Sequence, residues 1–134
     1  MLDTFVYGAH TTASDALWGG VPIVTRPGLL MQSRVAASLL TAAGLGSGAD
    51  GLVVASSEDY VSAAVALANS PPRLRALKDK VLEARDSPVF DTALWVANFE
   101  AGVREAADRL ASRGRRCCGD IVVSDLARVA GKET

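Results

Sequence analysis

The sequence predicts a small α/β domain in which short parallel strands are covered by helices. Apolar segments at Val21–Thr25 and Leu52–Ala55 are short and bounded by Gly, Pro or Ser, as buried strands are. A stretch with helical periodicity follows each segment. Because two parallel strands need a crossover connection, usually a helix, this alternation favours a parallel sheet.

A strand, a turn and a helix are expected before the first of these segments. The segment Leu2–Val6, in which three of the five residues are apolar, is interpreted as the end of a strand, and Gly8 gives the backbone freedom for a tight turn after it. Thr11 or Thr12 can cap the helix that follows, and the Gly pair at residues 19–20 ends it. The chain thus predicts a strand–turn–helix–strand unit near its beginning.

A second helix is expected from about Met31 to Gly44. One of its faces is predicted to consist of Val35, Ser38, Leu39 and Ala42. Small residues would let this helix pack closely on a sheet, namely Ala36, Ala37, Ala42 and Ala43.

Three further helices are expected at residues 57–68, 72–85 and 93–110. Ser56 or Ser57 opens the first of them, because acidic residues follow in its first turn. Trp18 and Trp95 lie at apolar helical positions, so both are expected to pack in the core.

Composition fits one soluble globular unit, since 49% of the 134 residues are hydrophobic and 22% are charged. The net charge of −1 gives no electrostatic argument for binding nucleic acid or an anionic membrane. No apolar run approaches the length that crosses a bilayer. We therefore expect neither a nucleic-acid nor a membrane partner.

Residues 111–134 are expected to form a disordered basic tail, because they contain several arginines and no sustained pattern. Cys117 and Cys118 are adjacent, which suits neither a zinc site nor a disulfide framework. A reducing compartment, the cytoplasm or the nucleus, is the expected location.

The turn and helix around His10 carry the main indication of function. A helix N-terminus has unpaired N–H groups and a partial positive charge, which suit a phosphate. Thr11 and Thr12 add hydroxyl groups at this end, and Asp15 lies one turn beyond Thr12 on the same face. An anion site beside a carboxylate that can accept sugar hydroxyls matches a nucleotide-sugar diphosphate.

Each of these residues also has a purely structural interpretation. Thr11 and Thr12 can simply cap the helix, and Asp15 can be a solvated acid near the positive end of the helix dipole. His10, the single histidine of the chain, can be a structural hydrogen-bonding group. The local sequence leaves these alternatives open.

The pattern His-Thr-Thr-x-x-Asp-x-Leu-Trp-x-Gly-x-Pro at residues 10–22 resembles the protein O-GlcNAc transferase family, glycosyltransferase family 41. This family includes the SPINDLY-type proteins and bacterial homologues. The resemblance covers about residues 2–110 in several separate blocks. These further blocks are Thr25–Gly28, Ser33–Leu40, Tyr60–Val61 and Ser87–Thr92.

The resemblance implies a GT-B fold, which has two Rossmann-like domains. Residues 1–110 would form the second half of the C-terminal, donor-binding domain. By position, Thr11 and Thr12 would hold the diphosphate, His10 would lie close to the nucleotide, and Asp15 would bind the ribose hydroxyls. Leu29 follows the Pro-Gly turn, where the family commonly has an acidic residue. Any contribution of that acidic side chain in the family is therefore not expected in this chain.

The implied reaction transfers N-acetylglucosamine from UDP-GlcNAc to Ser or Thr hydroxyls of proteins, without an obligatory metal or other cofactor. GDP-fucose and UDP-glucose remain alternative donors. No catalytic residue and no metal ligand is expected in this chain. The N-terminal catalytic domain and tetratricopeptide repeats of the family would be partners, and the acceptor protein would bind through them.

We therefore expect a fragment that is inactive by itself. The alternative is a catalytically inert module that binds nucleotide or packs against a partner polypeptide.

Overall fold

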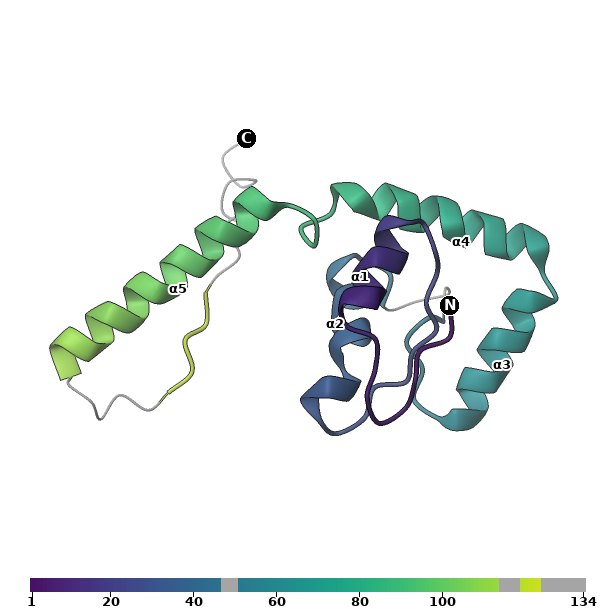
Figure 1. The fold of residues 1–134 in the computed structure, drawn as a ribbon, viewed down its shortest axis with the longest axis horizontal. Helices are drawn as coiled ribbons and strands as arrows, with labels where there is room; N and C mark the ends of the chain where they lie inside the picture. Colours follow the sequence, from purple (N-terminus) through teal and green to yellow (C-terminus); the bar gives the residue numbers. More distant parts are fainter. Residues whose placement is uncertain (47–50, 114–118, 124–134) are drawn as a thin grey trace. The chain divides into compact units, whose positions relative to one another are not determined.

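The computed structural model describes residues 1–46, 51–113 and 119–123, and the chain divides into two compact units, Met1–Phe90 and Asp91–Thr134. The first unit contains α1 (Thr11–Trp18), α2 (Val35–Ala42), α3 (Ser57–Ala68) and α4 (Pro71–Glu83), with the single-turn 3₁₀ helices η1 (Met31–Ser33) and η2 (Ala84–Asp86) (Figure 1). The second unit contains α5 (Thr92–Arg113). The expected helices are therefore present, within a few residues of their predicted ends.

Three extended segments of the first unit run parallel, but they pair only through isolated bridges. Leu2 bridges to Val24, and Thr25 bridges to Val53. The strands predicted at Val21–Thr25 and Leu52–Ala55 are therefore not confirmed among the described residues, although the parallel direction is as expected.

The pairing is short for local reasons. Pro22 has no N–H to donate to a neighbouring segment. The chain turns away after Thr25 at a Pro-Gly pair, and after Val54 it enters the cap of α3. Each bridge has two amide hydrogen bonds, for example Thr25 N–H to Leu52 O at 2.9 Å and Val54 N–H to Thr25 O at 3.0 Å, and the N-terminal ammonium group of Met1 adds a bond to Pro22 O.

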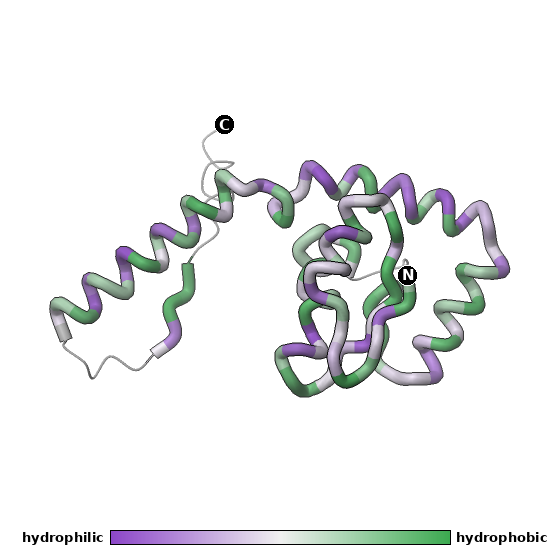
Figure 2. Tube along the Cα trace, in the orientation of Figure 1, coloured by the Kyte–Doolittle hydropathy of each residue, from purple (hydrophilic) through white to green (hydrophobic). Residues whose placement is uncertain are grey.

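Side chains from α1, α2 and α4 close over the extended segments and form the core of the first unit. The largest fully buried side chains are Leu17, Ile23, Leu40, Leu52, Leu77, Val81 and Thr25. Full burial of one such aliphatic side chain stabilises a fold by about 1.5–3 kcal/mol. Figure 2 shows hydrophobic residues concentrated along the extended segments and on parts of the helices.

The four residues predicted to share one face of α2 do so, but this face does not meet the core; of the four small residues expected to allow close packing, Ala36 and Ala37 are buried and Ala42 is exposed. The buried residues of α2 are Ala36, Ala37 and Leu40. The predicted face, which includes Val35 and Leu39, instead lines an open groove. The helix is apolar almost all round, so periodicity could not choose between two faces.

Most helix ends have the capping residues that the sequence predicts, and the start of α1 is the exception. Gly19 is the C-cap of α1, and Gly20 has the positive φ of 74° that its turn requires. Ser56 caps α3 through its side chain, which accepts from Asp59 N–H at 3.0 Å. Thr11 and Thr12 do not cap α1, because His10 occupies the N-cap position and Thr11 is already helical.

Neither tryptophan is buried, so this expectation is also wrong. Trp18, the last residue of α1, is 53% exposed, and the ring of Phe90 and the guanidinium of Arg85 lie against it. Trp95 is 61% exposed and stacks on Phe99 within α5.

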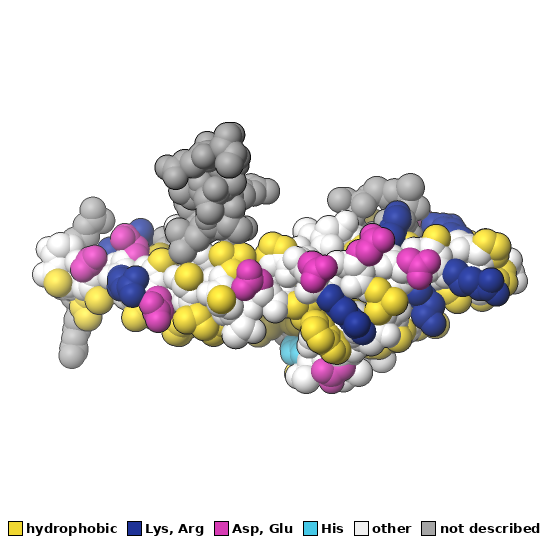
Figure 3. Space-filling view, turned by 90° about the horizontal axis from the view of Figure 1, so that it is seen from above, with side chains coloured by type: hydrophobic (Ala, Val, Ile, Leu, Met, Phe, Trp, Pro, Cys, Tyr) yellow, Lys and Arg dark blue, Asp and Glu magenta, His cyan; other side chains and the backbone are white. Residues whose placement is uncertain are grey.

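The second unit consists of α5 and the short segment 119–123 in the part that the structure describes. Ion pairs between residues four apart join Glu100 to Arg104 and Glu105 to Arg109. Hydrophobic side chains lie among the charged ones on the visible surface of α5 (Figure 3). None of the described helices is long and apolar enough to cross a membrane.

The predicted tail, residues 111–134, falls largely outside the described residues, as does the cysteine pair at 117–118. Residues 111–113 continue α5. The domain boundary at residue 110 stays a prediction.

Candidate functional site

The N-terminus of α1 has two backbone N–H groups that no described residue uses. Ala13 and Ser14 both donate to the carbonyl oxygen of His10, over 3.0 and 3.2 Å. Thr11 and Thr12 donate to no acceptor in the described part of the chain, and no side chain caps the helix. Unpaired N–H groups at a helix start are a place where an anion can bind.

The predicted polar side chains lie on the exposed side of this helix. Ala13 and Leu17 form its buried side, so the helical repeat places Thr11 and Asp15 opposite the core. Thr11, Thr12 and Asp15 are all exposed. No described residue bonds to the side chain of any of the three, which leaves two hydroxyl groups and one carboxylate available to a ligand.

His10 is held by two contacts. Its ring stacks on the ring of Tyr7, with centroids 4.8 Å apart and planes 19° from parallel. Its Nε2 lies 3.0 Å from the carbonyl oxygen of Gln32. Since a carbonyl only accepts, Nε2 carries the hydrogen, and in the neutral ring Nδ1 is an acceptor that no described residue uses. The histidine thus has a structural bond on one nitrogen and a free position on the other.

Sequence reasoning missed Asp3, which lies beneath this turn. Asp3 is 5% exposed, and its carboxylate accepts from the N–H groups of Thr4 and Ala9 and from the hydroxyl of Thr25. The sequence did contain a signal for this role, an aspartate within a mostly apolar segment. A carboxylate is almost never buried without partners, so such a residue is expected to hold neighbouring groups by hydrogen bonds.

Tyr60 of α3 fixes the main chain of the same residue. Its hydroxyl donates to the carbonyl oxygen of Asp3 over 2.6 Å. Burial, followed by the negative charge of Asp3, raises the pKa of Tyr60 above its ordinary value. The phenol therefore remains a donor in this contact over a wider pH range.

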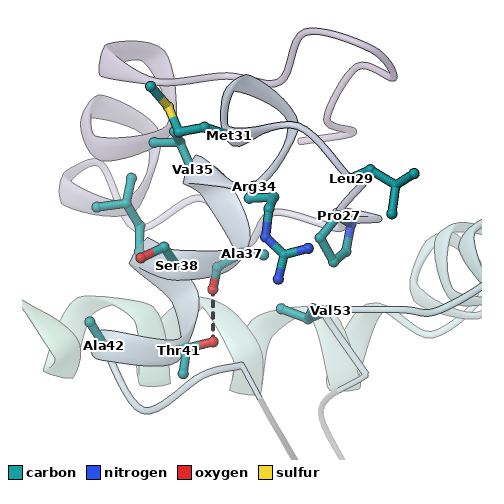
Figure 4. A pocket seen from close by; sticks show the side chains of 11 residues that line it. Pro27, Leu29, Met31, Arg34, Val35, Ala37, Ser38, Thr41, Ala42 and Val53 are labelled. Atoms are coloured by element: carbon teal, nitrogen blue, oxygen red, sulfur yellow. Dashed lines mark hydrogen bonds between the residues drawn. The ribbon is translucent and has the colours of Figure 1, made fainter. Parts of the chain in front are cut away.

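A groove of about 910 Å³ lies beside α2, away from the predicted residues. Its walls carry mostly apolar side chains together with that of Arg34 (Figure 4). The guanidinium of Arg34 donates to the carbonyl oxygen of Gly28 over 2.8 Å. None of His10, Thr11, Thr12 and Asp15 lines this groove. The structure thus brings the four predicted residues together at the start of α1 and separates them from the groove.

His10, Thr11, Thr12 and Asp15, together called the α1 site, carry groups suited to binding a ligand. The site offers N–H and O–H donors for an anion and a carboxylate acceptor for hydroxyl groups. In the described ranges, no three His, Cys, Asp or Glu side chains are grouped as metal ligands would be.

Comparison with known proteins gives a consistent result. The model of glycosyl transferase family 41 matches residues 1–99. A probable UDP-N-acetylglucosamine–peptide N-acetylglucosaminyltransferase SEC from Arabidopsis thaliana is 46% identical over 101 residues, which are 75% of this chain and 10% of that protein. The UDP-N-acetylglucosamine–peptide N-acetylglucosaminyltransferase of Caenorhabditis elegans is 39% identical over 100 residues, 74% of this chain and 8% of its own length.

A solved structure agrees with these relatives. A mutant O-GlcNAc transferase of Thermobaculum terrenum superimposes with a TM-score of 0.65 and 33% sequence identity, over 81% of this chain and 20% of that one. The chain thus spans only a small part of the relatives it matches. The matched residues 1–99 include the whole α1 site, and the chain belongs to glycosyl transferase family 41.

Proposed function

We propose that this chain forms the part of a UDP-GlcNAc-dependent protein glycosyltransferase that holds the nucleotide diphosphate. One observation carries the proposal: the unused N–H groups of Thr11 and Thr12 stand beside the exposed carboxylate of Asp15. A diphosphate needs donors and a ribose needs an acceptor, and this surface offers both within one helical turn. The names of the relatives support N-acetylglucosamine as the sugar and a peptide as the acceptor.

Within this proposal, Thr11 and Thr12 bind the diphosphate, Asp15 accepts from ribose hydroxyls, and His10 contacts the nucleotide through Nδ1. Negative charge grows on the diphosphate as the sugar bond breaks. Donors aimed at that charge stabilise the transition state more than the ground state. A single donor of this kind contributes about 3 kcal/mol, or roughly a hundredfold in rate.

The first unit is proposed as the second half of the C-terminal Rossmann-like domain of a GT-B enzyme. The parallel bridges between segments that alternate with helices support this placement. We propose that the choice of sugar, the binding of the acceptor and the catalytic base belong to other regions of the family, namely an N-terminal catalytic domain and tetratricopeptide repeats. No catalytic residue, metal or other cofactor is assigned to this chain.

A role as an inert interaction module is the second candidate, and exposed apolar side chains favour it. Leu29 and Met31, on the rim of the groove, are 98% and 73% exposed. Such a module has no need of a site for UDP, so ligand binding separates the two candidates.

The test is a nuclear magnetic resonance titration of the 134-residue chain with UDP, uridine and inorganic pyrophosphate. We expect UDP and pyrophosphate to shift the amide signals of Thr11 and Thr12, and UDP and uridine to shift that of Asp15. The ring signals of His10 can be followed without overlap, because it is the single histidine. If none of these signals moves at millimolar UDP, the donor-binding function is wrong and the interaction module is favoured.

A further inference from the structure

We propose that Asp3 is a positioning residue for the α1 site. Its buried carboxylate holds the loop Thr4–His10 in the conformation that presents His10 and the first N–H groups of α1. The effect on ligand binding rests on the proposed function above, whereas the effect on the loop does not.

The carboxylate of Asp3 joins both ends of the loop to the core. Oδ1 accepts from Thr4 N–H over 2.9 Å and from Ala9 N–H over 2.7 Å, and Ala9 directly precedes His10. Oδ2 accepts from the hydroxyl of Thr25 over 2.7 Å. Thr25 is fully buried in the central extended segment, and its hydroxyl adds a third bond to the carboxylate.

The main chain of Asp3 is fixed independently. Its N–H donates to Val24 O over 3.0 Å, and its carbonyl oxygen accepts from the hydroxyl of Tyr60. The main chain of Asp3 is thus fixed to the core, and its carboxylate holds the loop at a fixed place relative to the core. Since an ionised carboxylate accepts stronger hydrogen bonds than a neutral group, it suits this role.

The loop needs such an attachment because its backbone is strained. Val6 has a φ of +75°, which a β-branched residue rarely adopts, and its side chain is 80% exposed. A conformation of this kind persists only where the surroundings impose it, and it is found preferentially at ligand sites. The exposed Val6 side chain does not impose it by packing; the Thr4 hydroxyl donates to Tyr7 O over 2.6 Å across the turn, and the bonds to Asp3 hold both ends of the loop.

Contacts at Gly8 connect this attachment to His10. A Cβ on Gly8 would lie 3.1 Å from Oδ2 of Asp3 and 3.4 Å from the carbonyl oxygen of Gln32, so the loop packs directly on both groups. Gly8 N–H donates to that same oxygen over 2.9 Å, and His10 Nε2 donates to it as well. Loss of the carboxylate removes the attachment of Ala9, which lies between Gly8 and His10, and we expect this to displace the ring of His10 although both neighbours keep their bonds to Gln32 O.

The test compares Asp3→Ala, Asp3→Asn and Asp3→Glu with Thr25→Val as the matched control. The control removes one hydrogen bond from the same carboxylate but leaves both of its bonds to the loop. The measurements are the ring signals of His10 by nuclear magnetic resonance, the affinity for UDP, and the thermal melting temperature. If Asp3 has a merely structural role, its substitution lowers the melting temperature, but the His10 signals and the affinity for UDP change no more than they do in Thr25→Val.

We expect Asp3→Ala to shift the His10 signals and to weaken UDP binding about tenfold. Asp3→Asn should stay close to the wild type, because its amide oxygen can still accept from Thr4 and Ala9. Asp3→Glu should shift the His10 signals although it keeps the charge, because the acceptor is displaced. Thr25→Val should lower the melting temperature and leave the His10 signals nearly unchanged.

Wild-type His10 signals in both Asp3→Ala and Asp3→Glu would overturn the proposal. If Asp3→Ala does not fold, the His10 signals of Asp3→Asn and Asp3→Glu decide. Identical His10 signals in these two variants would also overturn the proposal. If the wild type does not bind UDP, the proposed function fails, while the His10 signals still decide the role of Asp3 in the loop.

Discussion

Tyr60 donates its hydroxyl hydrogen to the carbonyl oxygen of Asp3 over 2.6 Å, although 57 positions separate the two residues in the sequence. The contact joins α3 to the first extended segment. Phe5, which follows in the loop, packs edge-on against the ring of Tyr60 with centroids 4.9 Å apart. One side chain of α3 therefore supports the beginning of the loop that leads to the candidate site.

Removing the Tyr60 hydroxyl should change how stability depends on pH. The raised pKa means that the folded chain keeps the phenol proton after the unfolded chain has begun to lose it, near the ordinary value of 10.0. This contribution is complete below that pH and is lost as pH rises through the folded pKa. Urea unfolding from pH 8 to 11 should show a steeper loss of stability in the wild type than in Tyr60→Phe.

Tyr7→Phe is the control for this measurement, since Tyr7 is 63% exposed and its removal also deletes one phenol. At pH 7, Tyr60→Phe should cost about 1 kcal/mol through the lost hydrogen bond. Equal slopes above pH 10 for the wild type and Tyr60→Phe would contradict the expected role of Tyr60.

Asp15→Ala should weaken UDP binding by about ten- to a hundredfold, because ribose hydroxyls lose an ionised acceptor worth roughly 1.5–3 kcal/mol. Calorimetric titration of UDP into the wild type and the variant measures the change. Asp79→Ala is the matched control, since it removes an exposed acid from α4. Equal affinities in both variants would remove Asp15 from the site.

Thr12→Val should reduce affinity for pyrophosphate while leaving the folded state intact. The substitution keeps the shape of the side chain and removes an exposed hydroxyl that bonds to no described residue. Thr12→Ser, which retains the hydroxyl, should bind like the wild type. If Thr12→Val lowers the melting temperature but not the affinity, the hydroxyl has a structural role instead.

Ser56→Ala should destabilise the first unit by about 1 kcal/mol, because α3 loses its side-chain cap. The Ser56 hydroxyl accepts from Asp59 N–H and also donates to the Asp59 carboxylate over 2.7 Å. Ser57→Ala provides the comparison one residue further on, inside the helix. Urea unfolding should separate the two variants, and similar midpoints would show that this cap contributes little.

Leu40→Ala should cost about 2–5 kcal/mol, because Leu40 is fully buried and its removal leaves a cavity. Leu39→Ala should cost much less, since the half-buried Leu39 lines the open groove. Urea unfolding of the two variants tests which face of α2 meets the core. The reverse order would show that the groove face, and not the face of Leu40, meets the core.

Helix positions could be predicted from the sequence because their signals are local. The Gly pair after Trp18 and the Ser-Ser-Glu-Asp run at residues 56–59 each mark an end that the structure reproduces. The buried face of α2 could not be predicted, since apolar residues surround that helix. The extent of strand pairing also depends on where neighbouring segments turn away, which no local pattern records.

The candidate site divides in the same way. Thr11, Thr12 and Asp15 are close in the chain, so the helical repeat alone places them together. The support of His10 comes from residues remote in sequence: the carbonyl of Gln32 and, through Ala9, the carboxylate of Asp3. Such contacts are visible only in three dimensions.

The isolated bridges also determine which main-chain hydrogens are protected from water. Within the three extended segments, the amides of Asp3, Val24, Thr25 and Val54 donate to a neighbouring segment. The amides of Leu2, Ile23 and Val53 donate to no residue in the described ranges. Deuterium exchange should therefore be slow at the first set and faster at Leu2 and Val53, which are not buried, whereas Ile23 is shielded by its full burial. Only two amide hydrogen bonds join each bridged pair of segments in the part of the chain that the structure describes, so the packed side chains supply most of the cohesion between them.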